Sequence, residues 1–202
     1  MVDLKETPIT EITSTGVKTA DGKIHELDVI VFATGFDAVD GNYTRVAIRG
    51  RNGHTLKEHW SEAGPTSYLG ISVPEFPNLF MILGPNGPFT NLPPTIETQV
   101  EFISDVIENA ESRPGKGEQE EDHPHSSSSV IEATHGAEED WTELCDNLSA
   151  GSLFRKTDSW IFGANVPGKK PAVMFYFGGL GSYRKALADV VANGFRGFKL
   201  SS

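Results

Sequence analysis

The loop at residues 84–94 has the composition of a ligand-binding turn. It reads Gly-Pro-Asn-Gly-Pro-Phe-Thr-Asn-Leu-Pro-Pro and lies between an apolar run at residues 78–83 and a predicted helix. The N–H groups and the dipole at a helix N-terminus suit an electron-rich ring oxygen or a phosphate. A plain rigid loop is the alternative, and the residue pattern alone leaves both open.

Small residues also end an earlier apolar run. Residues 27–33 read Leu-Asp-Val-Ile-Val-Phe-Ala, and Thr34 and Gly35 follow. A chain that approaches a dinucleotide needs small residues, because a bulky side chain would hold the backbone away. Ligands of open α/β sheets bind at the C-terminal ends of strands. The tripeptide from Ala33 to Gly35 is therefore a candidate cofactor contact, with a simple strand-ending turn as the alternative.

The loop at residues 163–170 nearly matches a phosphate-binding P-loop, but the match fails. Lys170 stands where Ser or Thr should bind Mg²⁺, and Pro167 removes a needed N–H group. A strand rather than a helix is predicted to follow. What remains is a basic loop beside Trp160 that could touch a phosphate or a ribose.

No metal site is predicted. The pair His123 and His125 lies in a run that we expect to be disordered, and two mobile histidines do not form a site. The acidic residues 138–140 are most simply a solvated face, and Cys145 on an apolar helix stripe is most simply a small core residue.

These loops need strands and helices to position them. Residues 12–33 read as a small antiparallel meander around a turn at Ala20-Asp21-Gly22. The apolar runs at residues 27–33, 78–83 and 172–177 read as buried strands.

Apolar spacing predicts three helices, each with one inward face. The first begins near Pro93, the second is centred on residues 141–148, and the last ends at Asn193-Gly194. The residues expected to face inward are Ile96, Val100, Ile103 and Ile107; Trp141, Leu144, Cys145 and Leu148; and Leu187, Val190 and Val191. Residues 113–129 hold no large apolar side chain, so they are predicted to be a disordered insert.

Composition excludes several classes of partner. The chain has 202 residues and a formal charge of −11, which argues against nucleic acid and against anionic membranes. No apolar run approaches the roughly 20 residues that span a bilayer. One cysteine allows no internal disulfide, which fits a reducing, cytoplasmic location.

Pattern alone therefore indicates part of a dinucleotide-type α/β protein, and a family resemblance goes further. Residues 28–37 (DVIVFATGFD) resemble the ATG-containing segment of flavoprotein monooxygenases with two dinucleotide-binding domains. Residues 76–93, residues 158–165 (DSWIFGAN) and residues 175–179 (FYFGG) strongly resemble Baeyer–Villiger monooxygenases of the cyclohexanone-monooxygenase type. The resemblance covers nearly the whole chain except the insert.

The resemblance implies a partial two-dinucleotide-binding-domain flavoprotein with a Rossmann-like FAD/NAD(P) fold. Residues 1–34 would be the end of the NADPH-binding domain, comprising the meander and a return strand. Residues 35–202 would be the C-terminal part of the FAD-binding domain with its substrate-pocket loops. The N-terminal half of the enzyme would be missing, so the chain would be a C-terminal fragment.

The same resemblance implies residue roles. FAD would be contacted by Ala33, Thr34, Gly35, Asn91 and Leu92, and NADP by Trp160. The ketone pocket would be lined by Phe89, Thr90, Leu92 and Phe175. No catalytic residue is assigned, because those of the family are expected upstream.

The implied enzyme uses FAD and NADPH to insert one oxygen atom from O₂ next to the carbonyl of a small hydrophobic ketone, giving an ester or lactone. The chain departs from the family in having no G-x-G-x-x-G fingerprint for a dinucleotide pyrophosphate. It is therefore expected to be inactive alone and not to retain FAD. The alternatives are an N- or S-oxygenating flavin monooxygenase of the same architecture, or a non-catalytic binding module derived from one.

Overall fold

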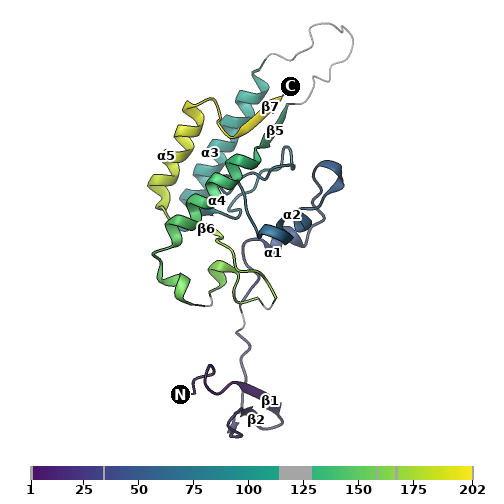
Figure 1. The fold of residues 1–202 in the computed structure, drawn as a ribbon, viewed down its shortest axis with the longest axis vertical. Helices are drawn as coiled ribbons and strands as arrows, with labels where there is room; N and C mark the ends of the chain where they lie inside the picture. Colours follow the sequence, from purple (N-terminus) through teal and green to yellow (C-terminus); the bar gives the residue numbers. More distant parts are fainter. Residues whose placement is uncertain (1, 34, 114–128, 158, 167, 202) are drawn as a thin grey trace. The chain divides into compact units, whose positions relative to one another are not determined.

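The chain forms two compact units in a computed structural model, which describes residues 2–33, 35–113, 129–157, 159–166 and 168–201. The first unit comprises Met1–Gly35 and the second Phe36–Ser202 (Figure 1). Thr34 and most of the predicted insert, residues 114–128, lie outside the described residues.

The first unit is a three-stranded antiparallel meander. Its strands β1 (Ile9–Thr13), β2 (Gly16–Thr19) and β3 (Ile24–Glu26) pair in sequence order. Gly16 is required by its neighbour, because a Cβ there would lie 1.9 Å from the carbonyl oxygen of His25. The predicted meander and its turn are confirmed.

The apolar run at residues 27–33 is not a buried strand, and this prediction is wrong. It has no strand partner within the first unit, and Val29, Val31 and Phe32 are each more than 70% exposed. A strand buried on both faces needs a neighbour on each side for its N–H and C=O groups. The run has strand composition, but the meander supplies no such neighbour.

The second unit is built on three helices that pack around one core (Figure 1). They are α3 (Leu92–Glu111), α4 (His135–Ser149) and α5 (Gly179–Ala192). The core takes Phe102 and Val106 from α3, Trp141 and Cys145 from α4, and Tyr183, Leu187 and Val190 from α5. All three predicted helices are confirmed.

Two small sheets complete this core. Strand β5 (Val130–Ala133) pairs antiparallel with β7 (Phe198–Ser201). Strand β4 (Gly87–Pro88) pairs parallel with β6 (Phe175–Tyr176). The described part of the chain is therefore mixed α/β and contains no extended parallel sheet.

The other two predicted strands are wrong or too long. Residues 78–83 do not form a strand, because Asn78 and Leu83 have positive φ angles of 57° and 58°, which an extended strand does not allow. The run at residues 172–177 contributes only the two residues of β6 to a sheet. Apolar content indicated burial correctly at Met81 and Met174, but did not distinguish a strand from a packed turn.

A second, smaller core lies under α2 (Leu56–Ala63). Helix α2 follows α1 (Gly41–Thr44) and a 3₁₀ turn at Arg51–Gly53 in the sequence. Thr55 and Glu58 form a capping box that starts α2, and this fixes where the helix begins. The buried residues of this core are Leu56, Trp60, Val73, Phe76 and Met81.

The predicted inward faces are only partly right. On α3, Ile103 and Ile107 pack on the core, but Ile96 and Val100 are exposed by 36% and 48%. The helix instead buries Gln99, whose amide accepts from the Leu83 N–H and donates to the Tyr183 hydroxyl. Polar residues with partners can thus replace apolar ones at buried positions. Similarly, Leu144, Leu148 and Val191 lie on the exposed sides of α4 and α5.

Among the described residues, no helix is both long and apolar enough to cross a membrane.

Candidate functional site

The loop before α3 is fastened to the segment around β6. Strand β4 pairs Gly87 with Phe175 and Pro88 with Tyr176, and the Phe89 N–H donates to the Tyr176 carbonyl at 2.9 Å. This ladder carries two predicted pocket residues, Phe89 and Phe175, to the same place although 86 positions separate them in the sequence.

Phe89 is the centre of an aromatic cluster. Its ring centroid lies 5.1 Å from that of Phe175, 5.5 Å from Phe177 and 5.8 Å from Phe154. Trp160 meets Phe175 edge-on at 5.8 Å. Three of the predicted site residues therefore form one apolar surface, and Phe89 remains 38% exposed on it.

Phe154 and Phe177 had no role in the sequence prediction, and one of them carried a usable signal. Residues two apart on an extended segment point to the same side, so Phe177 should share the face of Phe175. Phe154 lies in a 3₁₀ turn, Leu153–Lys156, far from Phe89 and Phe175 in the sequence. No local pattern indicated its contact with Phe89.

The N-terminus of α3 follows directly after this cluster. Thr90, Asn91 and Leu92 are all exposed, and the Asn91 side chain makes no capping bond. Pro93 and Pro94 occupy the first turn, so the predicted set of free N–H groups is smaller than a usual helix start would offer. The site can therefore give a ligand the backbone and side chains of Asn91 and Leu92, beside aromatic rings.

Trp160 is held by a 3₁₀ turn, Trp160–Phe162. The Ser159 hydroxyl caps this turn by accepting from the Ile161 N–H, and Ile161 and Phe162 are buried beneath it. The Trp160 ring remains 45% exposed. An exposed indole on a fixed turn suits stacking on a planar ligand group.

The basic loop after Trp160 is less available for a phosphate than its sequence suggested. The Lys169 ammonium lies 2.5 Å from a carboxylate oxygen of Asp37 and 2.5 Å from one of Asp40. Burial lowers the pKa of Lys169, but the bonds to the two carboxylates outweigh it and leave the pKa raised. Lys169 thus holds the loop to residues 37–40.

Ala33 and Gly35 belong to the first unit. Ala33 is exposed, and Gly35 has a φ of 83°, which a residue with a side chain adopts rarely. Thr34 lies outside the described residues. The predicted FAD contact of this tripeptide stays a prediction.

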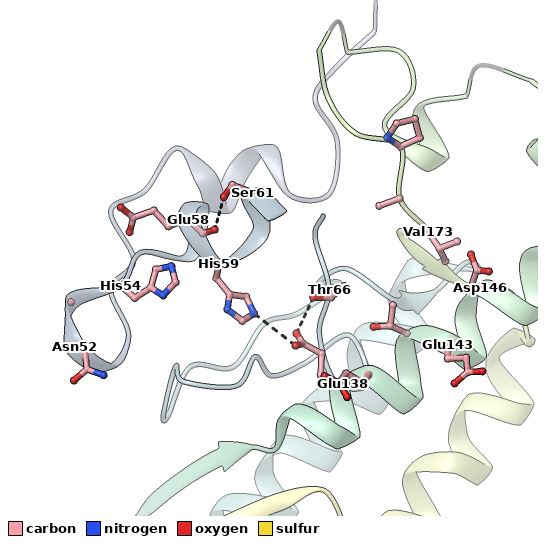
Figure 2. A pocket seen from close by; sticks show the side chains of 15 residues that line it. Asn52, His54, Glu58, His59, Ser61, Thr66, Glu138, Glu143, Asp146 and Val173 are labelled. Atoms are coloured by element: carbon pink, nitrogen blue, oxygen red, sulfur yellow. Dashed lines mark hydrogen bonds and ion pairs between the residues drawn. The ribbon is translucent and has the colours of Figure 1, made fainter. Parts of the chain in front are cut away.

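A separate hollow of about 1300 Å³ lies between α2, α4 and residues 171–173 (Figure 2). Glu138 of α4 points to His59 of α2, with 3.7 Å between His59 Nε2 and Glu138 Oε2, and accepts from the Thr66 hydroxyl. Glu138 is buried, so reading it as a solvated face was wrong. Within the described ranges, no three His, Cys, Asp or Glu side chains are grouped to hold a metal ion.

Comparisons with known proteins find relatives over nearly the whole chain. The chain is 51% identical over 98% of its length to a cyclohexanone 1,2-monooxygenase of an Acinetobacter species. It is 50% identical over its whole length to the phenazine N-monooxygenase PhzNO1 of Lysobacter antibioticus, and 50% identical over 96% to a Baeyer–Villiger monooxygenase of Pseudooceanicola batsensis. It spans about a third of each relative, between 33% and 35%.

Solved structures agree. The cyclohexanone monooxygenase of Rhodococcus sp. Phi1 bound to NADP⁺ matches the whole chain with a TM-score of 0.82 and 58% identity, over 35% of its own length. OTEMO in complex with FAD and NADP matches 99% of the chain with a TM-score of 0.77 and 32% identity, over 34% of its own length. No protein-family model matches the chain.

The chain is thus homologous to part of the length of FAD- and NADP-binding monooxygenases. Its relatives include cyclohexanone monooxygenases and a Baeyer–Villiger monooxygenase, and the chain corresponds to about a third of their length.

Proposed function

We propose that this chain forms one wall of the reaction site in an FAD- and NADPH-dependent Baeyer–Villiger monooxygenase. The product would be an ester or lactone made from a small hydrophobic ketone and O₂. The observation that carries this proposal is the contact of Phe89 with Phe175, beside Trp160, in a chain that is half identical to cyclohexanone monooxygenase.

The residues present fit part of a flavin. The exposed Asn91 and Leu92 offer polar and apolar groups beside the aromatic surface, as one side of a flat ring requires. A pyrophosphate has no matching cradle, because the sequence holds no G-x-G-x-x-G run. When bound, FAD reduced by NADPH would supply the activation of O₂.

In this proposal the chain's own residues bind the ketone and shield the reaction site from water. Phe89 and Phe175 exclude water and hold the hydrocarbon part of the ketone, with Thr90 and Leu92 at the margin of the pocket. Trp160 packs against the nicotinamide nucleotide. Phe154 and Phe177 extend the apolar wall, since both touch Phe89.

The same proposal gives each unit a place in the full enzyme. The first unit, with the unpaired apolar run at residues 27–33, would be the end of the NADPH-binding domain, and Ala33 to Gly35 would approach FAD. The second unit would be the C-terminal part of the FAD-binding domain. The exposed Ile96 and Val100 on α3 support this, because an apolar helix face is normally covered.

A chimera tests the proposal. This chain would replace the matching third of the Acinetobacter cyclohexanone monooxygenase, which differs from it at about half of the positions. We expect NADPH oxidation that depends on cyclohexanone, with lactone as the product by gas chromatography. A chimera that binds FAD and NADPH yet forms no lactone or ester from any cyclic or linear ketone would refute the proposal.

Nitrogen oxygenation is the second candidate, because PhzNO1 is as similar to this chain as the ketone-oxidising relatives are. The flat aromatic surface around Phe89 would also accept a planar heterocycle. Assaying the same chimera with phenazine and with cyclohexanone separates the two functions. Faster turnover of phenazine to its N-oxide would favour this candidate.

A further inference from the structure

Asn86 is a fully buried polar residue within the loop that carries Phe89. Its exposed fraction is 0%, and its φ is 63°, in the left-handed region that asparagine tolerates better than most residues. A buried amide is costly unless its donors and acceptors find partners. The partners of Asn86 therefore indicate what the residue does.

Asn86 joins three separate segments. Its side-chain Nδ2 donates to the Val173 carbonyl at 2.8 Å, and its Oδ1 accepts from the Ser67 N–H at 3.1 Å. Its own N–H donates to the Met174 carbonyl at 2.8 Å, and its carbonyl accepts from the Trp141 indole at 3.1 Å. Both polar groups of its backbone and both ends of its amide are thus in use.

These bonds lie immediately before the ladder that forms the aromatic surface. Val173 and Met174 precede Phe175, and Asn86 precedes Gly87, which pairs with Phe175. A slip of one residue in this ladder would turn Tyr176 rather than Phe175 toward Phe89. The ladder is only two residues long, so it has little of its own to fix the register.

Close packing holds the other side of the loop. A Cβ on Gly70 would lie 2.5 Å from the Gly87 Cα, and the Ser67 hydroxyl donates to the Pro85 carbonyl at 2.5 Å. Trp141 also stacks on Tyr176, with ring centroids 4.9 Å apart. Asn86 links this support to Val173 and Met174, the two residues just before Phe175.

We propose that Asn86 is a positioning residue of the substrate pocket: its side-chain amide selects the register that sets Phe89 against Phe175. Its relevance to substrate rests on the proposed function. The effect of Asn86 on the register depends only on its hydrogen bonds, and a separate measurement reads it.

Asn78 provides a control with similar bonds at an exposed position. It also has a positive φ, 57°, and its amide also joins two segments, accepting from the Ile131 N–H at 2.8 Å and donating to the Ser129 carbonyl at 3.2 Å. Neither of these bonds involves the aromatic cluster. Substituting Asn78 therefore removes similar bonds without affecting the hydrogen bonds that we propose to fix the register of β4 and β6.

The experiment compares Asn86→Asp and Asn86→Gly with Asn78→Asp and Asn78→Gly in the 202-residue chain, by NMR. Aspartate keeps the shape of the asparagine side chain but has no N–H to donate, so Asn86→Asp loses the bond to the Val173 carbonyl. Glycine allows the same positive φ angle but has no side-chain amide. We expect hydrogen exchange at the Phe89 N–H to accelerate at least tenfold in the Asn86 variants, with loss of the ring-to-ring NOE between Phe89 and Phe175. In Asn78→Gly, exchange should accelerate at the Ile131 N–H instead, whereas Asn78→Asp keeps the oxygen that accepts from Ile131 and should leave both N–H groups protected.

Either of two results overturns the proposal. One is a folded Asn86 variant that keeps Phe89 protected and its NOE to Phe175. The other is unfolding of both Asn86 variants while both Asn78 variants fold, which would assign Asn86 to stability alone. Titrating cyclohexanone into the unsubstituted chain tests the proposed function independently. If the NMR resonances of Phe89 and Phe175 do not shift, the residues do not line a ketone pocket. That result would leave the role of Asn86 in the register unaffected.

Discussion

At the scale of single residues, the proposed function depends on the aromatic cluster. Phe89, Phe175 and Trp160 come from three separate segments and still meet within 6 Å, ring centroid to neighbouring centroid. Edge-to-face contacts of this kind stabilise a wall whose rings keep their orientation. That is what a pocket needs if it must hold a nonpolar molecule in one pose.

Phe175→Ala should weaken the binding of cyclohexanone. Removing the ring opens the wall beside Phe89 and lets water in, so we expect the dissociation constant in the cyclohexanone-monooxygenase chimera to rise by about tenfold, as for a lost aromatic contact. Leu153→Ala is the control, because Leu153 lies 76% exposed beside Phe154. Equal effects of the two substitutions would remove Phe175 from the pocket.

Lys169→Met should destabilise the chain although it keeps most of the side-chain volume. Asp40 is only 6% exposed, and the substitution leaves its carboxylate without a cation. We expect a loss of about 1–3 kcal/mol in urea unfolding, the range for an unpaired buried polar group. Lys185→Met, at an exposed position of α5, should cost almost nothing, and Asp40→Asn should recover part of the loss in the Lys169→Met background.

At the scale of elements, the sequence predicted helices better than strands. Helix α3 was found from its prolines and its apolar spacing, because these are local signals. The runs at residues 27–33 and 78–83 have the composition of strands but lack partners or contain left-handed residues, and composition records neither property. Buried Gln99 and Asn86 were missed for a related reason, since their partners Tyr183 and Val173 lie more than 80 positions away.

The ion pair between Glu132 of β5 and Arg51, in the turn before α2, should make the free energy of unfolding depend on pH. Arg51 donates to Glu132 with both Nε and a terminal nitrogen, and the Glu75 N–H donates to its other oxygen, so the pKa of Glu132 lies below its ordinary value of 4.5. The stabilisation is complete above the ordinary pKa and is lost as the pH falls through the lowered one.

Glu132→Gln should therefore flatten the decline of the unfolding free energy between about pH 5 and pH 3. Urea titrations at several pH values measure this. Glu139→Gln is a suitable comparison, because Glu139 is exposed on α4. If both variants lose stability with falling pH as steeply as the unsubstituted chain, the ion pair contributes nothing.

At the scale of the whole molecule, the division into two units matters most. The sequence resemblance predicted a boundary after Thr34, and the compact units divide after Gly35. It could not predict how much of each unit folds without the other two thirds of the relatives' length, because strand pairing and helix burial depend on residues far away in the sequence.

The purified chain should not retain FAD. In the proposed function it supplies part of a surface for the flavin ring, but its sequence contains no G-x-G-x-x-G run to hold the pyrophosphate. After gel filtration in the presence of FAD, we expect no flavin absorbance at about 450 nm in the protein peak. The chimera treated identically is the positive control, and a yellow 202-residue chain would contradict the prediction.

The unpaired apolar run of the first unit has a consequence for handling the protein. The segment from Val29 to Phe32 lacks proline and charge, is exposed, and has no strand partner within the first unit. Such a segment invites intermolecular β-sheet growth at high concentration. The charge of −11 opposes that association by mutual repulsion, so added salt, by screening it, would promote precipitation rather than solubility.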